Sequence, residues 1–517
     1  MLPALLAAIL LVSLYYFSSG GWKTTSTKKL LPSPRGFPFI GNLHQLGHPL
    51  HISLCKLSKE HGSLILLHLG RTPTVVVSSA ELAHEFMRTH DRCFANRPRL
   101  KVSKFLLYDG KDLPFAPYGE YWRQVKKLCI TQLLSSKMVE SFAPLRALEV
   151  THLLRSISSV AADRGVISLE AFNLFTNAVM CNAVLGTSVS DERKKLLAEM
   201  IHANSVYFAQ LFAEDYFPAL WWLDALLGLE GKLRKHFKRW DALLDMMIEE
   251  HVGSSQEGGA CFLDVLLDIQ KNDSSTSNIC LTKEHIKALL LVMIAARTDT
   301  SFAVLDWTMS ELVRNPNLMR KTQEEIRIIA NGEATVREEH LSKMHYLKAV
   351  IKEVLRLHPP SPLLAPREAI RDCQIHGYEI PRKTRVLINA WAISRDRESW
   401  ENPEEFRPER FLECPIDYKG NNFEYTPFGA GRRMCPGMQF AIATIELVLA
   451  NVLCFFDWKL PDGLREDDMD MTEGEGITCL RKQRLLLVPV PAKLKCKNGC
   501  GPDHIKHGDC DLSTRMI

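Results

Sequence analysis

Two patterns of apolar positions alternate along this chain. From about Ala80 to Asn315 apolar residues recur at three- and four-residue spacing, which predicts a series of helices. Ahead of that region, the runs 63–70 and 74–78 are rich in β-branched and aliphatic residues, and the Gly-Arg-Thr-Pro between them predicts a hairpin turn. Strand-like runs return at 384–388 and 484–488. We therefore expect a mainly α-helical fold with a minor β region.

One helix is expected to be much longer than the others. It runs from Thr282, a plausible helix cap, to Asn315, where the following Pro316 forces a stop. At about 1.5 Å per residue, a helix of this length crosses a whole domain. A second apolar helix is expected from about Met438 to Phe456. Polar gaps at 254–259 and 271–278 are interpreted as surface loops.

The N-terminus is a separate apolar segment. Residues 2–17 carry no charge, and with the small residues that follow they reach the roughly 20 residues that span a bilayer. A cleaved secretory signal would carry positive charge ahead of the apolar run. Here Lys23, Lys28 and Lys29 follow it, which places the rest of the chain in the cytosol. We expect an uncleaved transmembrane anchor at 1–22, followed by a basic, proline-rich hinge at 23–38.

Composition sets limits on the remainder. The 517 residues contain no internal repeat or low-complexity linker, so we expect one domain at 39–492. The net charge of +4 is too small to indicate nucleic-acid binding, and the 14 cysteines lack the paired spacing of a disulfide framework. Most cysteines are therefore expected to be buried thiols. The polar tail 493–517 could suggest zinc, but irregular spacing favours a disordered tail; its candidate ligands are Cys496, Cys500, His504 and Cys510.

The candidate chemistry centres on Cys435. This residue lies among glycines and arginines in the run 427–437, immediately ahead of an apolar helix. The helix N-terminus and unpaired backbone N–H groups favour a thiolate there. Gly429 and Gly437 let the backbone approach a flat ligand closely, and Phe428 can pack against it. A lone cysteine in such a turn is often structural, but this spacing indicates a haem whose iron takes a Cys thiolate.

Charged residues elsewhere would position that cysteine loop. Glu353 and Arg356 share one face of an apolar helix, and Arg410 lies just upstream of the loop. Such pairs also cover many solvated surfaces. Beside Cys435, however, the three residues predict a buried ion network that fixes the loop.

A set of donors is predicted to bind the haem propionates. Trp122 and Lys126 lie four residues apart on one helix, although an amphipathic surface helix is the alternative. Arg433 and Arg367 would close on the same groups from elsewhere in the chain, and Arg97 is a weaker fifth candidate.

The middle of the long helix places an acid beside a hydroxyl. The hydroxyl of Thr300 can donate a hydrogen bond to the carbonyl of Ala296, which opens a groove in the helix. Beside a metal, this groove could hold dioxygen while Asp299 relays protons. A helix with a solvated polar patch is the alternative.

Together these motifs resemble the cytochrome P450 family, the haem-thiolate monooxygenases, from the N-terminal segment to about residue 491. The runs 115–123, 389–393 and 427–433 are similar to plant membrane-bound members of specialised metabolism. The resemblance implies the cytochrome P450 fold and haem b held by Cys435. It also implies that Glu353, Arg356 and Arg410 form a supporting network. Asp299 and Thr300 would be a catalytic pair for proton delivery.

The resemblance further implies a function. We expect insertion of one oxygen atom from O2 into a small hydrophobic plant metabolite, with electrons from NADPH through a separate reductase. The location would be the endoplasmic reticulum membrane, with a single span and a cytosolic catalytic domain. A haem-thiolate isomerase or dehydratase and a weakly active or non-catalytic haem protein are the alternatives. The expected substrate walls are Phe105–Leu107, Phe208–Phe212, Met293, Leu363–Ala365 and Glu475–Ile477.

Arg297 departs from the family pattern. The distal motif of the family has a small residue where this chain has a large side chain with a permanent charge. If Arg297 points toward the iron, it could crowd the oxygen groove or hold an anionic group of the substrate. If it points outward, it could pair with a carboxylate. Altered or reduced activity follows from the first arrangement.

Overall fold

The structure is a computed structural model that describes residues 31–186, 190–253, 261–271 and 281–493. The predicted anchor at 1–22 and the loop at 254–259 lie outside these residues. So do half of the hinge, most of the loop at 271–278 and nearly all of the tail.

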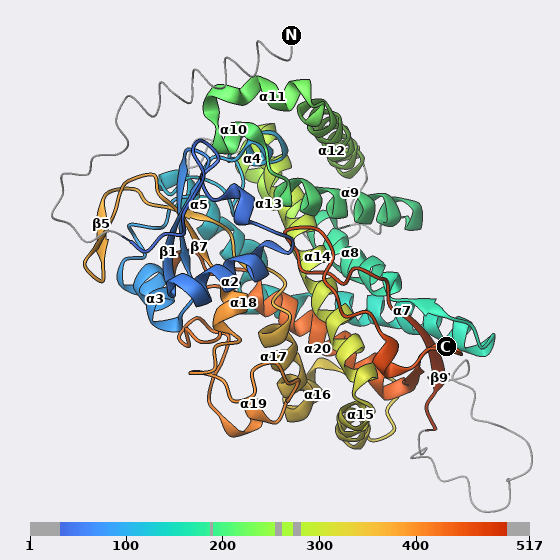
Figure 1. The fold of residues 1–517 in the computed structure, drawn as a ribbon. Coiled ribbons are helices and arrows are strands. Elements are labelled where there is room, and N and C mark those ends of the chain that lie inside the picture. The colour runs from blue at the N-terminus through green and yellow to red at the C-terminus, as the bar shows by residue number, and fades with distance from the viewer. Residues whose placement is uncertain (1–30, 187–189, 254–260, 272–280, 494–517) are drawn as a thin grey trace, which may run out of the picture.

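One helix, α14 (Lys283–Arg314), runs through the middle of the molecule (Figure 1). The Thr282 side chain accepts a hydrogen bond from the His285 backbone N–H, and the helix ends at Asn315 ahead of Pro316. These bounds confirm the prediction from the sequence. Around it pack α8 (Glu170–Leu185), α9 (Asp191–Ala209), α12 (Leu229–Gly253), α17 (His345–Leu357) and α20 (Met438–Phe455).

The other helices complete a mainly helical body. The longer ones are α2 (Leu50–His61), α5 (Glu120–Cys129), α7 (Ala143–Ala162), α13 (Phe262–Lys271) and α15 (Pro316–Ala330). The shorter ones are α3 (Ala80–His84), α4 (Lys101–Leu106), α6 (Ser136–Ser141), α10 (Ala213–Tyr216), α11 (Trp221–Leu226), α16 (Glu338–Leu341), α18 (Ala390–Ile393) and α19 (Arg410–Glu413). Both α14 and α20 are long and apolar enough to cross a membrane, but they are mostly buried inside the protein and are core helices.

The minor β region lies mainly to one side of α14 (Figure 1). Its largest sheet has the order β1 (Leu64–Leu69), β2 (Thr72–Val77), β7 (Arg385–Ile388) and β4 (Arg367–Glu368). The smaller sheets are β3 (Ile167–Ser168), β9 (Leu486–Pro491) and β8 (Phe456–Lys459), and β5 (Cys373–Ile375) with β6 (Tyr378–Ile380). The predicted hairpin is present as β1 and β2 in antiparallel pairing.

Two predicted boundaries in the β region were wrong. The hairpin turn is shorter than expected, because Thr72 and Pro73 already pair with β1 and only two residues connect the strands. Gly70 adopts a φ of 59° there, which glycine tolerates. The last strand begins at Leu486 and continues through two prolines. The prolines are tolerated because β9 pairs only with β8 at those positions, so the other edge of β9 needs no N–H donor there.

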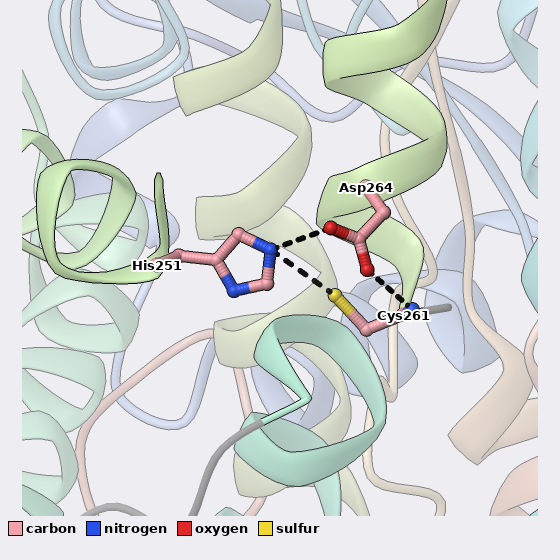
Figure 2. Close-up of side chains that lie close together, drawn as sticks. All are labelled: His251, Cys261 and Asp264. Atoms are coloured by element: carbon pink, nitrogen blue, oxygen red, sulfur yellow. Dashed lines mark hydrogen bonds and ion pairs between the residues drawn. The ribbon is translucent and has the colours of Figure 1, made fainter. Parts of the chain in front are cut away.

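The described cysteines are all free and most are buried, as expected. One of them helps to cap α13 (Figure 2). The backbone N–H of Cys261 donates to Asp264 Oδ2 over 2.8 Å, while Asp264 Oδ1 lies 2.7 Å from His251 Nε2. Burial raises the pKa of the Cys261 thiol to about 12. Although these side chains are of metal-ligating types within 4.8 Å of one another, the cap already accounts for their arrangement.

Glu446 on α20 is expected to make stability depend on pH. Burial raises the pKa of its carboxyl from 4.5 to about 7, partly opposed by Lys348. The unfolded chain therefore loses this proton at lower pH than the folded chain does, so stability falls as pH rises between those values and is constant above them. We expect Glu446→Gln to stabilise the fold by about 1–3 kcal/mol at pH 8 and by much less at pH 4.

Chemical denaturation at several pH values measures this effect. The matched control is Glu466→Gln, because Glu466 is exposed. Equal gains from both substitutions at every pH would contradict the assignment to Glu446.

Candidate active site

A cavity lies between the middle of α14 and the cysteine loop. It encloses about 1450 Å³, part of which opens to solvent. Cys435 lines one side and is exposed to this space, whereas Ala296 and Thr300 on α14 line another. The predicted cofactor residues Phe428, Gly429, Gly437, Arg433, Arg367, Trp122 and Lys126 all line the same cavity.

Backbone hydrogen bonds fix the cysteine loop. The N–H of Cys435 donates to the carbonyl of Phe428 over 2.9 Å, and that of Arg432 donates to Asp91 Oδ2 over 2.8 Å. Gly431 adopts a φ of 69°, and a Cβ at this position would overlap the carbonyl of Met87. Only glycine therefore allows the loop to approach the neighbouring helical segment this closely.

The thiol of Cys435 experiences opposing influences. Burial raises its pKa, while the N–H of Gly437 and the charges of Arg297 and Lys126 lower it. The helix N-terminal donors predicted from the sequence are thus present, but the thiol pKa still lies above its ordinary value because burial has the larger effect. A metal cation bonded to sulfur would reverse this balance.

The predicted ion network joins α17 to the segment that leads into the cysteine loop. Arg356 donates to both carboxylate oxygens of Glu353, each over 2.8 Å, and Arg410 Nε donates to Glu353 Oε1 over 3.0 Å. Glu353 and Arg356 are fully buried. Arg356 Nη1 also donates to the carbonyls of Ser394 and Pro403, so the network ties α17 to the chain that leads into the cysteine loop.

The predicted propionate donors gather on one wall, but each of them already has a hydrogen-bond partner. Trp122 Nε1 donates to the carbonyl of Leu113, and Lys126 Nζ donates to that of Arg432. The guanidinium of Arg433 lies 4.2 Å from the Trp122 ring centroid. Further donor bonds run to backbone carbonyls: Arg433 to Ala95 and Ala116, Arg367 to Ala430, and Arg97 to Pro114, Ala365 and Pro366.

This wall carries excess positive charge. Burial lowers the pKa of Arg433 to about 9, and repulsion from Arg367 adds to the effect. Burial also lowers the pKa of Arg97 strongly, again with repulsion from both other arginines. Asp91 forms an ion pair with Arg367 over 3.2 Å, but Asp112 compensates the other two arginines little, because burial raises its pKa to about 7. A ligand with two carboxylates would supply the missing negative charge, so this wall fits a haem with its propionates.

The hydrogen bond predicted to open a groove in α14 is present. Thr300 Oγ1 donates to the carbonyl of Ala296 over 2.7 Å, and both residues line the cavity. Asp299 does not line it. This side chain is buried, which raises its pKa, while hydrogen bonds from Thr478 and Ser205 oppose the shift, and Oδ2 has no partner.

Arg297 lines the cavity and pairs with no carboxylate among the described residues, so it does not take the outward direction. Its guanidinium lies inside the protein, 4.7 Å from the ring centroid of Phe440 on α20, with Nη1 3.9 Å from Met180 Sδ. Burial lowers its pKa to about 10, so the group remains charged at neutral pH. The side chain runs from α14 toward Phe440 on α20 and Met180 on α8.

The predicted substrate walls are partly correct. Met293, Leu364 and Ala365 line the cavity, whereas the predicted segments at 105–107, 208–212 and 475–477 do not. Phe208 instead stacks on Phe115 with ring centroids 5.0 Å apart. The sequence interpretation missed the lining residues Leu113, Val292, Ser301, Val304 and Leu355. Spacing of four residues from Ala296 and from Thr300 would have identified Val292 and Val304 on α14.

Comparisons with known proteins agree with this site. The family model for cytochrome P450 matches residues 31–488. Strychnine-11-hydroxylase from Strychnos nux-vomica is 46% identical over 91% of this chain and 93% of its own length. Psoralen synthase from Pastinaca sativa is 47% identical over 89% of this chain and 96% of its own length.

The fold has solved counterparts as well. A zebrafish cytochrome P450 solved with progesterone matches 86% of this chain and 100% of its own with a TM-score of 0.74 and 26% identity. The family match, the plant relatives and the cavity-facing cysteine lead to one assignment. The chain belongs to the cytochrome P450 family, and it is a haem-dependent monooxygenase related to plant enzymes of specialised metabolism.

Proposed function

We propose that this chain inserts one oxygen atom from O2 into a small hydrophobic plant metabolite. One observation carries the proposal: the Cys435 thiol and the hydrogen-bonded pair Thr300 and Ala296 line the same cavity, whose remaining walls are largely apolar. Electrons would come from NADPH through a separate reductase that docks on the basic face around the cysteine loop, where Arg432 is exposed. The segment 1–22 would anchor the protein in the endoplasmic reticulum membrane.

Residues of this chain would hold the cofactor in defined ways. Cys435 would ligate the iron, Phe428 would pack against the porphyrin, and Gly429 would allow close approach of the backbone. The space beside Gly437 is taken by the guanidinium of Arg297, which corrects the role expected for this glycine. Lys126, Arg367, Arg433 and Arg97 would bind its carboxylates by charge and by the donor groups left over from their backbone bonds. Trp122 would exchange the bond of its single indole N–H to the Leu113 carbonyl for one to a carboxylate. When bound, haem b supplies the electron transfer and oxygen chemistry.

Two residues of α14 would take part in proton delivery. Thr300 holds a hydroxyl proton at the cavity wall, with its position fixed by the bond to Ala296. Asp299 retains its proton to higher pH than an exposed acid, because burial raises its pKa. The charge of His202, an exposed residue on α9, acts on Asp299. We infer a route from the surface near His202 through Asp299 to Thr300.

The apolar walls indicate the substrate class. Val292, Met293, Val304, Leu355 and Leu364 offer apolar contact without hydrogen-bonding groups. Such a pocket selects by shape. The plant relatives include a strychnine hydroxylase, a psoralen synthase and a costunolide synthase. Their names refer to different compounds, which have in common only that they are small plant metabolites. We therefore propose this class and no single member.

Oxygenation assays on a metabolite library test the proposal. Substrates are first selected by a shift of the Soret band, and the full chain is then supplied with reductase, NADPH and isotopically labelled dioxygen. We expect one labelled oxygen atom in the product. A product formed without labelled oxygen and without NADPH would instead identify an isomerase or dehydratase and overturn the proposal.

Thr300→Val is expected to uncouple the reaction. Loss of the hydroxyl removes the proton held at the cavity wall, so product formed per NADPH should fall by about tenfold or more. Thr298→Val is the matched control, because Thr298 makes the same kind of bond, to the carbonyl of Ile294 over 2.8 Å, but does not line the cavity. Equal losses in both variants would assign the effect to helix geometry and not to proton delivery.

A further inference from the structure

Arg297 is a buried cation without a carboxylate partner in the part of the chain that the structure describes. Its residue surface is 8% exposed, and Nη2 has no hydrogen-bond partner. The side chain lines the cavity beside the cysteine loop. A Cβ placed on Gly437 would lie 2.8 Å from Nη2, so the guanidinium lies against the backbone two residues after Cys435.

Its surroundings offer little negative charge. A buried ion that lacks a partner is strongly destabilising. The N-terminus of α20, which begins at Met438, adds partial positive charge and disfavours a cation there. The aromatic face of Phe440 compensates only in part. Another group must therefore supply the counter-charge.

Two cysteines interact favourably with the Arg297 charge, Cys435 and Cys129. Burial raises the pKa of Cys129 to about 12, so this thiol is neutral at neutral pH. Cys435 is the residue that becomes an anion when its sulfur ligates a metal. The partner of Arg297 is thus the sulfur that faces the cavity.

We propose that Arg297 is a positioning residue that supplies a fixed positive charge, and its free N–H, to the thiolate side of the haem site. This inference rests on the proposed function. A positive charge near the sulfur reduces the electron density that the thiolate donates. It also stabilises the state of the site that carries one more electron. Arg297 should therefore raise the midpoint potential of the ferric/ferrous couple.

The same placement preserves the oxygen groove. Ala296 and Thr300 keep their hydrogen bond and remain on the cavity wall, while the Arg297 side chain runs toward α8 and α20. The departure from the family motif therefore changes the electrostatics of the iron ligand and does not block oxygen.

Redox titration of the full-length, haem-loaded protein tests this proposal. Dithionite supplies one electron per ferric haem in the presence of mediator dyes, without oxygen or substrate. We expect Arg297→Met to lower the midpoint potential and Arg297→Lys to give a value between those of Met and Arg. The Soret band of the ferrous–CO complex should shift in the same order, because it responds to electron donation by sulfur.

Met180→Leu is the matched control. It alters the packing around Arg297 Nη1 but leaves the charge in place, so its potential should equal that of the unmodified chain. An unchanged or higher potential in Arg297→Met would overturn the inference, as would an equal shift in Met180→Leu. If the Met variant retains no haem, Arg297→Gln and Arg297→Lys are compared, and equal potentials in these two overturn the inference. Absence of a thiolate-type CO band in the unmodified chain would instead overturn the proposed function.

Discussion

Cys435→Ala is expected to abolish monooxygenation and the thiolate-type ferrous–CO spectrum together. The sulfur of Cys435 faces the cavity, and no histidine is among the described residues that line it, so no replacement imidazole ligand is available. Without the thiolate, the electron donation that favours O–O cleavage is lost. Product formation should fall by about a thousandfold or more, which is the scale expected when an essential group is removed.

The measurements are the haem-to-protein ratio, the ferrous–CO spectrum and product formation in the reductase-coupled assay. Cys129→Ala is the matched control, because Cys129 is fully buried at the end of α5 and does not line the cavity. We expect this variant to keep the spectrum of the unmodified chain. A Cys435→Ala protein with an unchanged CO spectrum would contradict the assignment of the iron ligand.

Arg356→Met is expected to cause the largest loss of stability. The substitution leaves Glu353 fully buried with Arg410 as its remaining ion-pair partner, and it also removes donors to the carbonyls of Ser394 and Pro403. Breaking a buried pair in this way costs about 3–5 kcal/mol. Because the network ties α17 to the chain that leads into the cysteine loop, haem retention should decline as well.

Chemical denaturation and the rate of haem transfer to a scavenger apoprotein measure both effects. Arg337→Met is the control, since Arg337 forms ion pairs with Glu333 and Glu339 while its side chain is 60% exposed. Such a surface pair contributes at most about 1 kcal/mol. Similar losses in Arg356→Met and Arg337→Met would show that the buried network does not support the loop.

Sequence reasoning was most accurate where local signals determine structure. Thr282 and Pro316 set the ends of α14, and the Thr300 hydroxyl forms the predicted bond within its own helix. The cysteine loop was also predictable from the sequence, because its backbone conformation and its close contacts require glycines. The turn before β2 was misplaced because Thr72 and Pro73 extend the pairing with β1. The start of β9 was misplaced because it depends on pairing with the distant strand β3.

The direction of individual side chains depended on distant segments. Asp299 is adjacent to Thr300, yet it faces Ser205 and Thr478 and not the cavity. The predicted propionate donors line the cavity, but their bonds to backbone carbonyls of other segments were not predictable from spacing. The segments expected at the substrate wall near 105 and 476 lie elsewhere, because the packing of loops against α14 decides which residues reach the cavity.

The sequence alone determined the fold class, the cysteine that can ligate iron, and the helix that faces it, because caps, glycines and apolar periodicity act within a few residues. Only the tertiary structure decided where Arg297 lies. Its place depends on Phe440 and Gly437, some 140 residues later in the chain, and on Met180, well over 100 residues earlier. Contacts over such separations arise from the packing of α8, α14 and α20, which no local pattern encodes.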